Sequence, residues 1–140
     1  VYRVYKDYME ALHLQPELPE SLWIKGWAVF LEPDEKIELH CHSYHENSYL
    51  SANISFAEGT TTDYVIPHLT TYYGSWKCSN KEGRITMFPS WVEHSVEPVK
   101  ERRYSIGLDL FDFNTMDYIS NNRDHNSHEQ NTILEAIRLA

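Results

Sequence analysis

Short segments with the residue pattern of β-strands follow one another along most of this chain. The segments with alternating or continuous apolar residues are 22–31, 36–42, 50–56, 62–66, 69–76, 85–88 and 103–110. Polar turns such as Pro33-Asp34 and 80–83 separate them. Short strands at this spacing, without regular alternation of strand and helix, are typical of an antiparallel sandwich or barrel. We therefore predict an all-β fold.

The two ends of the chain have a different pattern. Apolar residues recur at helical spacing over residues 1–13, and Pro16 follows, so we predict an amphipathic helix there. Residues 132–140 are predicted to form a short second helix. A length of 140 residues suits one domain. We predict a single domain over 1–140, with a core barrel at about 22–112 between the terminal helical segments.

Charge and composition narrow the classes of partner. The net charge is −9 and no basic patch stands out, so a nucleic acid is not an expected partner. No apolar run approaches the roughly 18 residues of a membrane span. Cys41 and Cys78 make no disulfide framework, which favours reduced thiols and a cytoplasmic location. An unknown small molecule or peptide is therefore the expected partner, and the apolar strand 22–31 could also serve a homodimer.

The segment 36–42 contains two candidate metal ligands. Its alternation places Glu38, His40 and His42 on one face of a strand, with Ile37, Leu39 and Cys41 on the other. Two imidazoles on one strand face can bind the same divalent ion, and His45 and Glu46 on the adjoining turn offer a further ligand. Imidazole with carboxylate suits iron, zinc or manganese better than calcium. We expect this strand to form a hairpin with segment 50–56.

A third histidine and an anion-binding pair lie further along the chain. The strand 85–88 runs into Pro89-Ser90-Trp91, and the chain returns through His94. Alternation from 103 to 110 places Arg103 and Ser105 on one face together with Gly107 and Asp109, with Tyr104, Ile106, Leu108 and Leu110 opposite. A guanidinium and a hydroxyl on one face can bind a carboxylate. Arg102 falls on the opposite face.

These residues carry a resemblance to a known family. Phe88-Pro89-Ser90-Trp91, His94, Val96 and Pro98, followed by Arg103-x-Ser105, resemble the C-terminal half of 2-oxoglutarate and Fe(II)-dependent oxygenases of phages and marine bacteria. The resemblance covers roughly residues 22–112. It implies a double-stranded β-helix, with Fe(II) and 2-oxoglutarate as cofactors.

The resemblance also implies roles for individual residues. His40 and His94 would bind iron, and Arg103 would bind the far carboxylate of 2-oxoglutarate with help from Ser105. The family usually has Asp or Glu at the position of His42, so His42, His45 and Glu46 all remain candidates for the third ligand. No catalytic residue beyond the metal ligands is predicted.

A second resemblance leads to the same fold. His40-x-His42-x-x-x-Glu46 and the later Pro89 and His94 are similar to the two cupin motifs without their glycines. That resemblance implies the ligand set His40, His42, Glu46 and His94. Three functions remain open: an oxygenase acting on an unknown substrate, a cupin-type metalloprotein with another activity, and a metal-free barrel that acts as a binding module.

Overall fold

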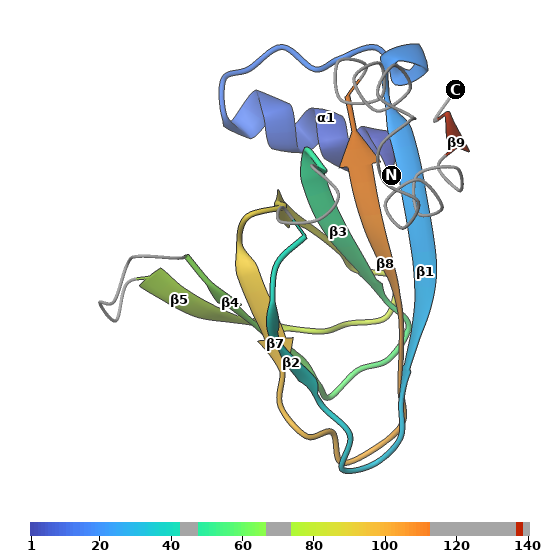
Figure 1. Cartoon of the computed structure of the whole chain (residues 1–140), viewed down its shortest axis with the longest axis vertical. Helices are drawn as coiled ribbons and strands as arrows, with labels where there is room; N and C mark the ends of the chain where they lie inside the picture. The colour runs from blue at the N-terminus through green and yellow to red at the C-terminus, as the bar shows by residue number, and fades with distance from the viewer. Residues whose placement is uncertain (43–47, 67–73, 113–136, 139–140) are drawn as a thin grey trace, which may run out of the picture.

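The computed structural model describes residues 1–42, 48–66, 74–112 and 137–138. Within these ranges the chain forms one α-helix, a 3₁₀ turn and two antiparallel sheets (Figure 1). In chain order the elements are α1 (Tyr2–Ala11), η1 (Pro19–Ser21), β1 (Trp23–Leu31), β2 (Ile37–His40), β3 (Leu50–Ser55), β4 (Thr61–Val65), β5 (Ser75–Ser79), β6 (Ile85–Pro89), β7 (Glu93–Val96), β8 (Arg103–Phe111) and β9 (Ile137–Arg138).

The strands form a jelly-roll sandwich, which confirms the predicted all-β fold. The larger sheet has the order β6-β3-β8-β1-β9, and the smaller sheet has the order β2-β7-β4-β5. From β1 to β8 the chain passes repeatedly from one sheet to the other, and the two sheets face each other in Figure 1. The inner faces of the two sheets therefore enclose the space between them.

The predicted hairpin between segments 36–42 and 50–56 is wrong. β2 pairs with β7, whereas β3 pairs with β6 and β8 in the opposite sheet. Both segments have the alternating pattern of a strand, but alternation states only which residues share a face. Partner choice follows from burial across the whole sandwich, and β3 becomes a central strand of the larger sheet.

The N-terminal helix is present and covers the outer face of the larger sheet. Figure 1 shows α1 lying across one end of β3, β8 and β1. Tyr5 and Met9 are buried in a cluster with Leu22, Leu50 and Leu110. The Tyr5 hydroxyl also accepts a hydrogen bond of 2.9 Å from the backbone N–H of Glu17. The helix thus buries apolar side chains on the outer face of this sheet, away from the space between the sheets.

The prediction of a second helix over 132–140 is wrong at Ile137 and Arg138. These two residues form β9, which pairs with Trp23 and Ile24 of β1. The outer edge of β1 offers unpaired backbone groups, and pairing with that edge outweighs a weak local helix preference. The other residues of 132–140 lie outside the described ranges.

The structure also bears on three smaller predictions, which concern a strand, the two cysteines and membrane spans. The predicted strand 69–76 meets β5 only at Ser75 and Trp76, and residues 69–73 lie outside the described ranges. Cys41 and Cys78 form no disulfide. Across the described ranges, the chain has no helix with the length and hydropathy of a membrane span.

Candidate metal centre

An irregularity in β2 turns its histidine toward the inside of the sandwich. Ile37 is paired with Val96 and His40 with His94, so β2 takes three steps where β7 takes two. The extra residue is a β-bulge, which breaks the alternation. Ile37 and His40 consequently line the same cavity, and Leu39 is 51% exposed. The prediction that Ile37 and His40 lie on opposite faces is therefore wrong.

Three histidines converge between the sheets. His40 ends β2, His94 lies on β7 directly opposite it, and His42 follows β2. One potential ligand atom from each lies within 4.8 Å of the others. The ring centroids are 4.3 Å apart for His40 and His94, 5.0 Å for His42 and His94, and 5.2 Å for His40 and His42. Bonds of roughly 2.0–2.1 Å to one metal ion place neighbouring ligand atoms about 3.0–3.4 Å apart, so a pair near the 4.8 Å limit would have to approach by about 1.5 Å.

Hydrogen bonds fix which nitrogen of each ring is available. The Nδ1 atoms of His40 and His94 lie 2.8 Å and 3.3 Å from the carbonyl oxygens of Glu38 and Val92. The Nδ1 atom of His42 lies 2.7 Å from Oδ1 of Asp109. Because each of these partners accepts, each Nδ1 carries the proton and donates it. Nε2 of each neutral ring then keeps its lone pair, which is the form that ligates metals.

Burial keeps His94 in the neutral form. Burial lowers its pKa to about 3, and the neighbouring His40 and His42 act in the same direction. A proton on this ring would place a charge in a half-buried site beside two other imidazoles, of which His40 is exposed. His94 therefore has its lone pair available throughout the physiological pH range.

Arg103 is buried in the same cavity and is incompletely bonded. The residue is 1% exposed, and Nη2 donates to Oγ1 of Thr62 at 3.1 Å. Among the described residues, the buried Nε and Nη1 have no hydrogen-bond partner. Burial lowers the pKa of this guanidinium, although Tyr64 opposes that effect. A buried cation with two unpaired N–H groups is costly unless an anion binds it.

The neighbouring Arg102, unlike Arg103, is exposed and paired with a carboxylate. It lies on the outside of the molecule, where Nε donates to Oε2 of Glu32 at 2.8 Å. The two neighbouring arginines thus lie on opposite faces of the chain, and the buried one has unpaired donors.

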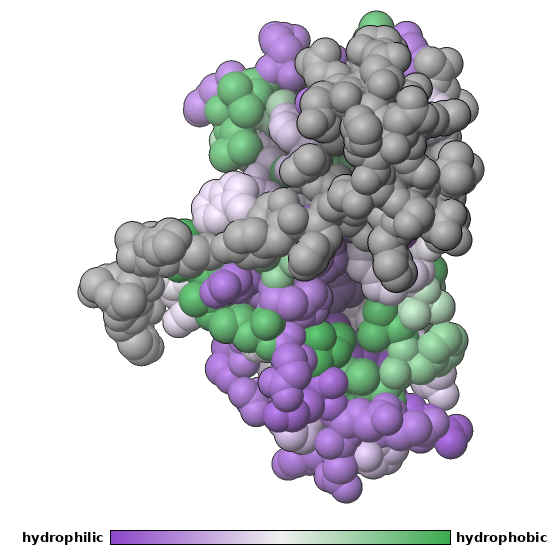
Figure 2. Space-filling model, viewed as in Figure 1, coloured by the Kyte–Doolittle hydropathy of each residue, from purple (hydrophilic) through white to green (hydrophobic). Residues whose placement is uncertain are grey.

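The cavity that joins these groups has a volume of about 230 Å³. His40, His42 and His94 line it together with Arg103 and Ser105. Its walls are largely apolar, with Trp27, Val29, Ile37, Ala52, Phe88 and Val96 among the lining residues. Figure 2 shows a band of hydrophobic side chains above the hydrophilic lower end of the molecule, where the two sheets face each other in Figure 1. The lining of the cavity thus combines apolar walls with the polar side chains of the histidines, Arg103 and Ser105.

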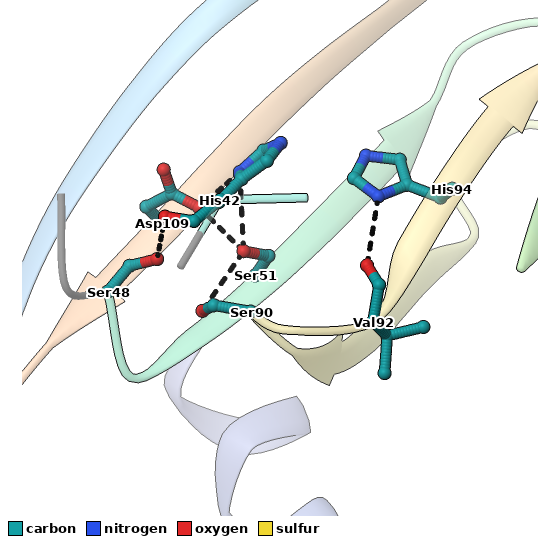
Figure 3. Close-up of polar contacts among 7 residues, drawn as sticks. All are labelled: His42, Ser48, Ser51, Ser90, Val92, His94 and Asp109. Atoms are coloured by element: carbon teal, nitrogen blue, oxygen red, sulfur yellow. Dashed lines mark hydrogen bonds and ion pairs between the residues drawn. The ribbon is translucent and has the colours of Figure 1, made fainter. Parts of the chain in front are cut away.

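A buried carboxylate lies behind His42, at a residue for which the sequence predicts no role. Asp109 is 1% exposed, and its Oδ1 accepts hydrogen bonds from Nδ1 of His42 and from Oγ of Ser51, each at 2.7 Å (Figure 3). Oγ of Ser51 also lies 3.2 Å from Oγ of Ser90. The alternation of β8 places Asp109 on the same face as Arg103. An acidic residue on that inward face is the sequence signal from which a role for Asp109 could have been predicted.

The structure describes some predicted site residues and not others. It brings together His40, His42, His94, Arg103 and Ser105. Glu46 and His45 lie outside the described residues. Among the described residues, His42 is the group that supplies a third potential ligand.

Comparisons with known proteins show similarity at the level of the fold. No protein-family model matches the sequence, and no curated protein matches it. Among solved structures, a 2OG-Fe(II) oxygenase family oxidoreductase from Burkholderia pseudomallei is similar over 79% of this chain, with a TM-score of 0.61 and 14% identity. A prolyl-4-hydroxylase from Pseudomonas putida is similar over 64% of this chain, with a TM-score of 0.51 and 16% identity.

A third similar structure is SnoN, a non-heme alpha ketoglutarate dependent epimerase from nogalamycin biosynthesis. It matches 65% of this chain, with a TM-score of 0.56 and 14% identity. The matched regions cover 51%, 51% and 47% of the three proteins, so this chain spans about half their length. The closer resemblance to oxygenases of phages and marine bacteria stays a prediction. The chain has the fold of 2OG-Fe(II) oxygenases.

Proposed function

We propose that this chain is a non-haem Fe(II) oxygenase that uses 2-oxoglutarate to oxidise an organic substrate. One observation carries the proposal. The buried guanidinium of Arg103, with unpaired N–H groups at Nε and Nη1, lines the same cavity as the three convergent histidines. A divalent metal and a carboxylate could therefore be held within one small space. The shared fold is consistent with this proposal.

The described residues fit a divalent transition metal. His40, His42 and His94 would hold it through Nε2, and imidazole suits iron as well as zinc, copper and nickel. The set differs from the facial triad of two histidines and one carboxylate, because all three of these groups are neutral. Fe(II) at this position would supply the activation of dioxygen, coupled to oxidative decarboxylation of 2-oxoglutarate.

The same cavity fits a small dicarboxylate. Arg103 would bind the far carboxylate through its unpaired N–H groups, and Ser105 lines the cavity beside it. A volume of about 230 Å³ lies below the roughly 300–1,000 Å³ of most drug-sized ligand sites. The apolar walls would exclude water and strengthen the contact between guanidinium and carboxylate.

Binding and turnover of 2-oxoglutarate test the proposal. The Fe(II)-loaded protein should bind 2-oxoglutarate in anaerobic calorimetry and should form succinate when oxygen is admitted. We expect Arg103→Ala to weaken binding by roughly 30-fold or more, because loss of one partner of a buried charge pair costs about 2–5 kcal/mol. Metal content should stay normal in that variant.

Arg102→Ala is the matched control, because Arg102 pairs with Glu32 at the surface. It should leave 2-oxoglutarate binding unchanged. Equal effects of the two substitutions, or no binding of 2-oxoglutarate by the iron-loaded parent protein, would rule out the oxygenase.

The all-histidine set also favours a second candidate, a cupin-type metalloprotein with a different activity. His40, His42 and His94 match the imidazole part of the predicted cupin ligand set, to which Glu46 would add a carboxylate. Stoichiometric metal without 2-oxoglutarate binding would identify this function. Absence of metal from protein incubated with Fe(II), Zn(II) and Mn(II) would leave the metal-free binding module.

The substrate is proposed by class alone. The charge of −9 disfavours a nucleic acid, since phosphate contacts require lysine and arginine. We therefore expect a small molecule or a peptidyl side chain. Incubation of the iron-loaded protein with both classes, measured as stimulation of succinate formation, would separate them.

A further inference from the structure

We propose that Asp109 is a positioning residue for the metal, which supplies from behind His42 the negative charge that the three-histidine set lacks. The inference rests on the proposed metal binding and goes beyond it, because it assigns a role to a residue outside the ligand set. The geometry in Figure 3 carries it: Asp109, Ser51 and Ser90 lie behind His42, and the ring extends from them toward His94.

The three histidines are held by different kinds of partner. His40 and His94 donate through Nδ1 to backbone carbonyl oxygens, at 2.8 Å and 3.3 Å. His42 donates at 2.7 Å to a carboxylate. A carboxylate that accepts the proton of a ligating imidazole makes the opposite nitrogen a stronger donor to the metal, and a neutral carbonyl does so less. His42 is therefore the ligand whose electron donation the protein increases most.

The carboxylate is fixed in place. Oδ1 of Asp109 accepts from both His42 and Ser51 at 2.7 Å, and Ser51 lies 3.2 Å from Ser90. Asp109 is 1% exposed, Ser51 is 0% exposed and Ser90 is 2% exposed, so water does not compete strongly for these groups. The three residues come from β8, β3 and the turn after β6, which hold the carboxylate rigidly behind the ring.

The neutral charge of the ligand set explains why a carboxylate behind His42 would matter for metal binding. Three neutral imidazoles leave the full double positive charge of a bound divalent ion uncompensated by the ligands. Asp109, which accepts the hydrogen bond of His42, would lie one imidazole ring away from that ion. Its negative charge would stabilise the ion through His42 without occupying a coordination position, and would leave that position open.

A purely structural role is the competing explanation. The contact between His42 and Asp109 links the segment after β2, in the smaller sheet, to β8 in the larger sheet. If Asp109 only holds the chain, its charge is immaterial and its removal changes stability without a specific change at the metal. The two explanations differ in metal affinity and in coupling to His42.

Metal titration of Asp109→Asn separates them. The substitution keeps the shape and removes the charge, and affinity for Co(II) and Zn(II), measured against a competing chelator, should fall by about 10–100-fold. The visible absorption bands of bound Co(II) should shift, because donation by His42 weakens. Glu32→Gln makes the same change of net charge at an exposed ion pair and should leave affinity unchanged.

A double-mutant cycle with His42→Ala tests whether Asp109 acts on the metal through the ring of His42. In the His42→Ala background, Asp109→Asn should produce little further loss of affinity, because the carboxylate acts through that ring. Equal losses in both backgrounds, or a Co(II) spectrum unchanged by Asp109→Asn, would overturn the inference. Failure of the parent protein to bind any metal would instead overturn the proposed function, so the two failures are distinguishable.

Ser51→Ala serves if Asp109→Asn does not fold. It removes one of the two hydrogen bonds to the same oxygen and retains the charge, so affinity for Co(II) should fall severalfold, less than for loss of the carboxylate. An affinity equal to that of the parent would again overturn the role of Asp109.

Discussion

His94 illustrates how its surroundings determine the chemistry of one side chain. Burial, assisted by His40 and His42, lowers its pKa to about 3. The unfolded chain has an ordinary histidine there, with a pKa near 6.5. As the pH falls below about 6.5, the unfolded state takes up a proton that the folded state does not accept until about pH 3. The contribution of His94 to stability is therefore complete above pH 6.5 and is lost on acidification through this window.

Replacing His94 by a residue that does not titrate should make the free energy of unfolding depend less on pH. In the presence of a chelator, the free energy of unfolding of the parent protein should fall more steeply between pH 6.5 and 3 than that of His94→Gln. Urea denaturation at a series of pH values measures both curves. Parallel curves would mean that His94 is not desolvated as the structure indicates.

At the scale of elements, β1 and β8 pair over their full length and form one wall of the cavity. Trp27 pairs with Gly107, and its indole lies with its centroid 5.3 Å from that of His42. A Cβ atom on Gly107 would lie 2.6 Å from Cε2 of Trp27. The absence of a side chain at Gly107 is thus what allows Trp27 to lie against the inner face of β8, beside the histidines.

Gly107→Ala should therefore displace Trp27. We expect a loss of about 1–3 kcal/mol in the free energy of unfolding, as for other overpacked sites, together with weaker 2-oxoglutarate binding. Urea denaturation followed by tryptophan fluorescence and calorimetry would measure the two effects.

Gly26→Ala is the control on the neighbouring strand. Its added Cβ would lie 2.9 Å from Cδ2 of Leu108, the end of a flexible side chain, and Gly26 does not line the cavity. It should cost less stability and leave ligand binding unchanged. Equal losses of stability and of ligand binding in the two variants would contradict the inference that Trp27 needs the space left by the missing side chain of Gly107.

At the scale of the whole molecule, the histidine cluster joins the two sheets. His40 and His94 belong to the smaller sheet, and His42 is bonded to Asp109 of the larger sheet. An ion bound by all three would therefore link the two halves of the sandwich. Since the unfolded chain has no such preformed site, binding should stabilise the fold.

Metal should therefore raise the melting temperature of the protein. At a free Co(II) or Zn(II) concentration 100 times the Kd, the added stability should be about 2.7 kcal/mol. Calorimetric or circular-dichroism melting curves with metal and with chelator measure it. His94→Ala should show a much smaller shift, and a shift as large as that of the parent would place the bound metal elsewhere.

The features that the sequence predicts correctly are those that depend on the period of a strand or helix. Alternation predicted the all-β fold and the inward-facing series Arg103, Ser105 and Gly107, and helical spacing predicted α1. These predictions succeed because the side-chain period is a local property of the backbone, and because a buried face must be apolar or functionally polar.

Strand pairing and the contacts between distant side chains could not be predicted from the sequence and follow from the complete fold. The pairing of β2 with β7, the bulge that turns Ile37 and His40 to one side, and β9 at the edge of β1 all depend on contacts between distant segments. The link from His42 to Asp109 joins residues that lie far apart in the chain. No local pattern specifies such contacts, because they are selected by the burial and hydrogen bonding of the complete sandwich.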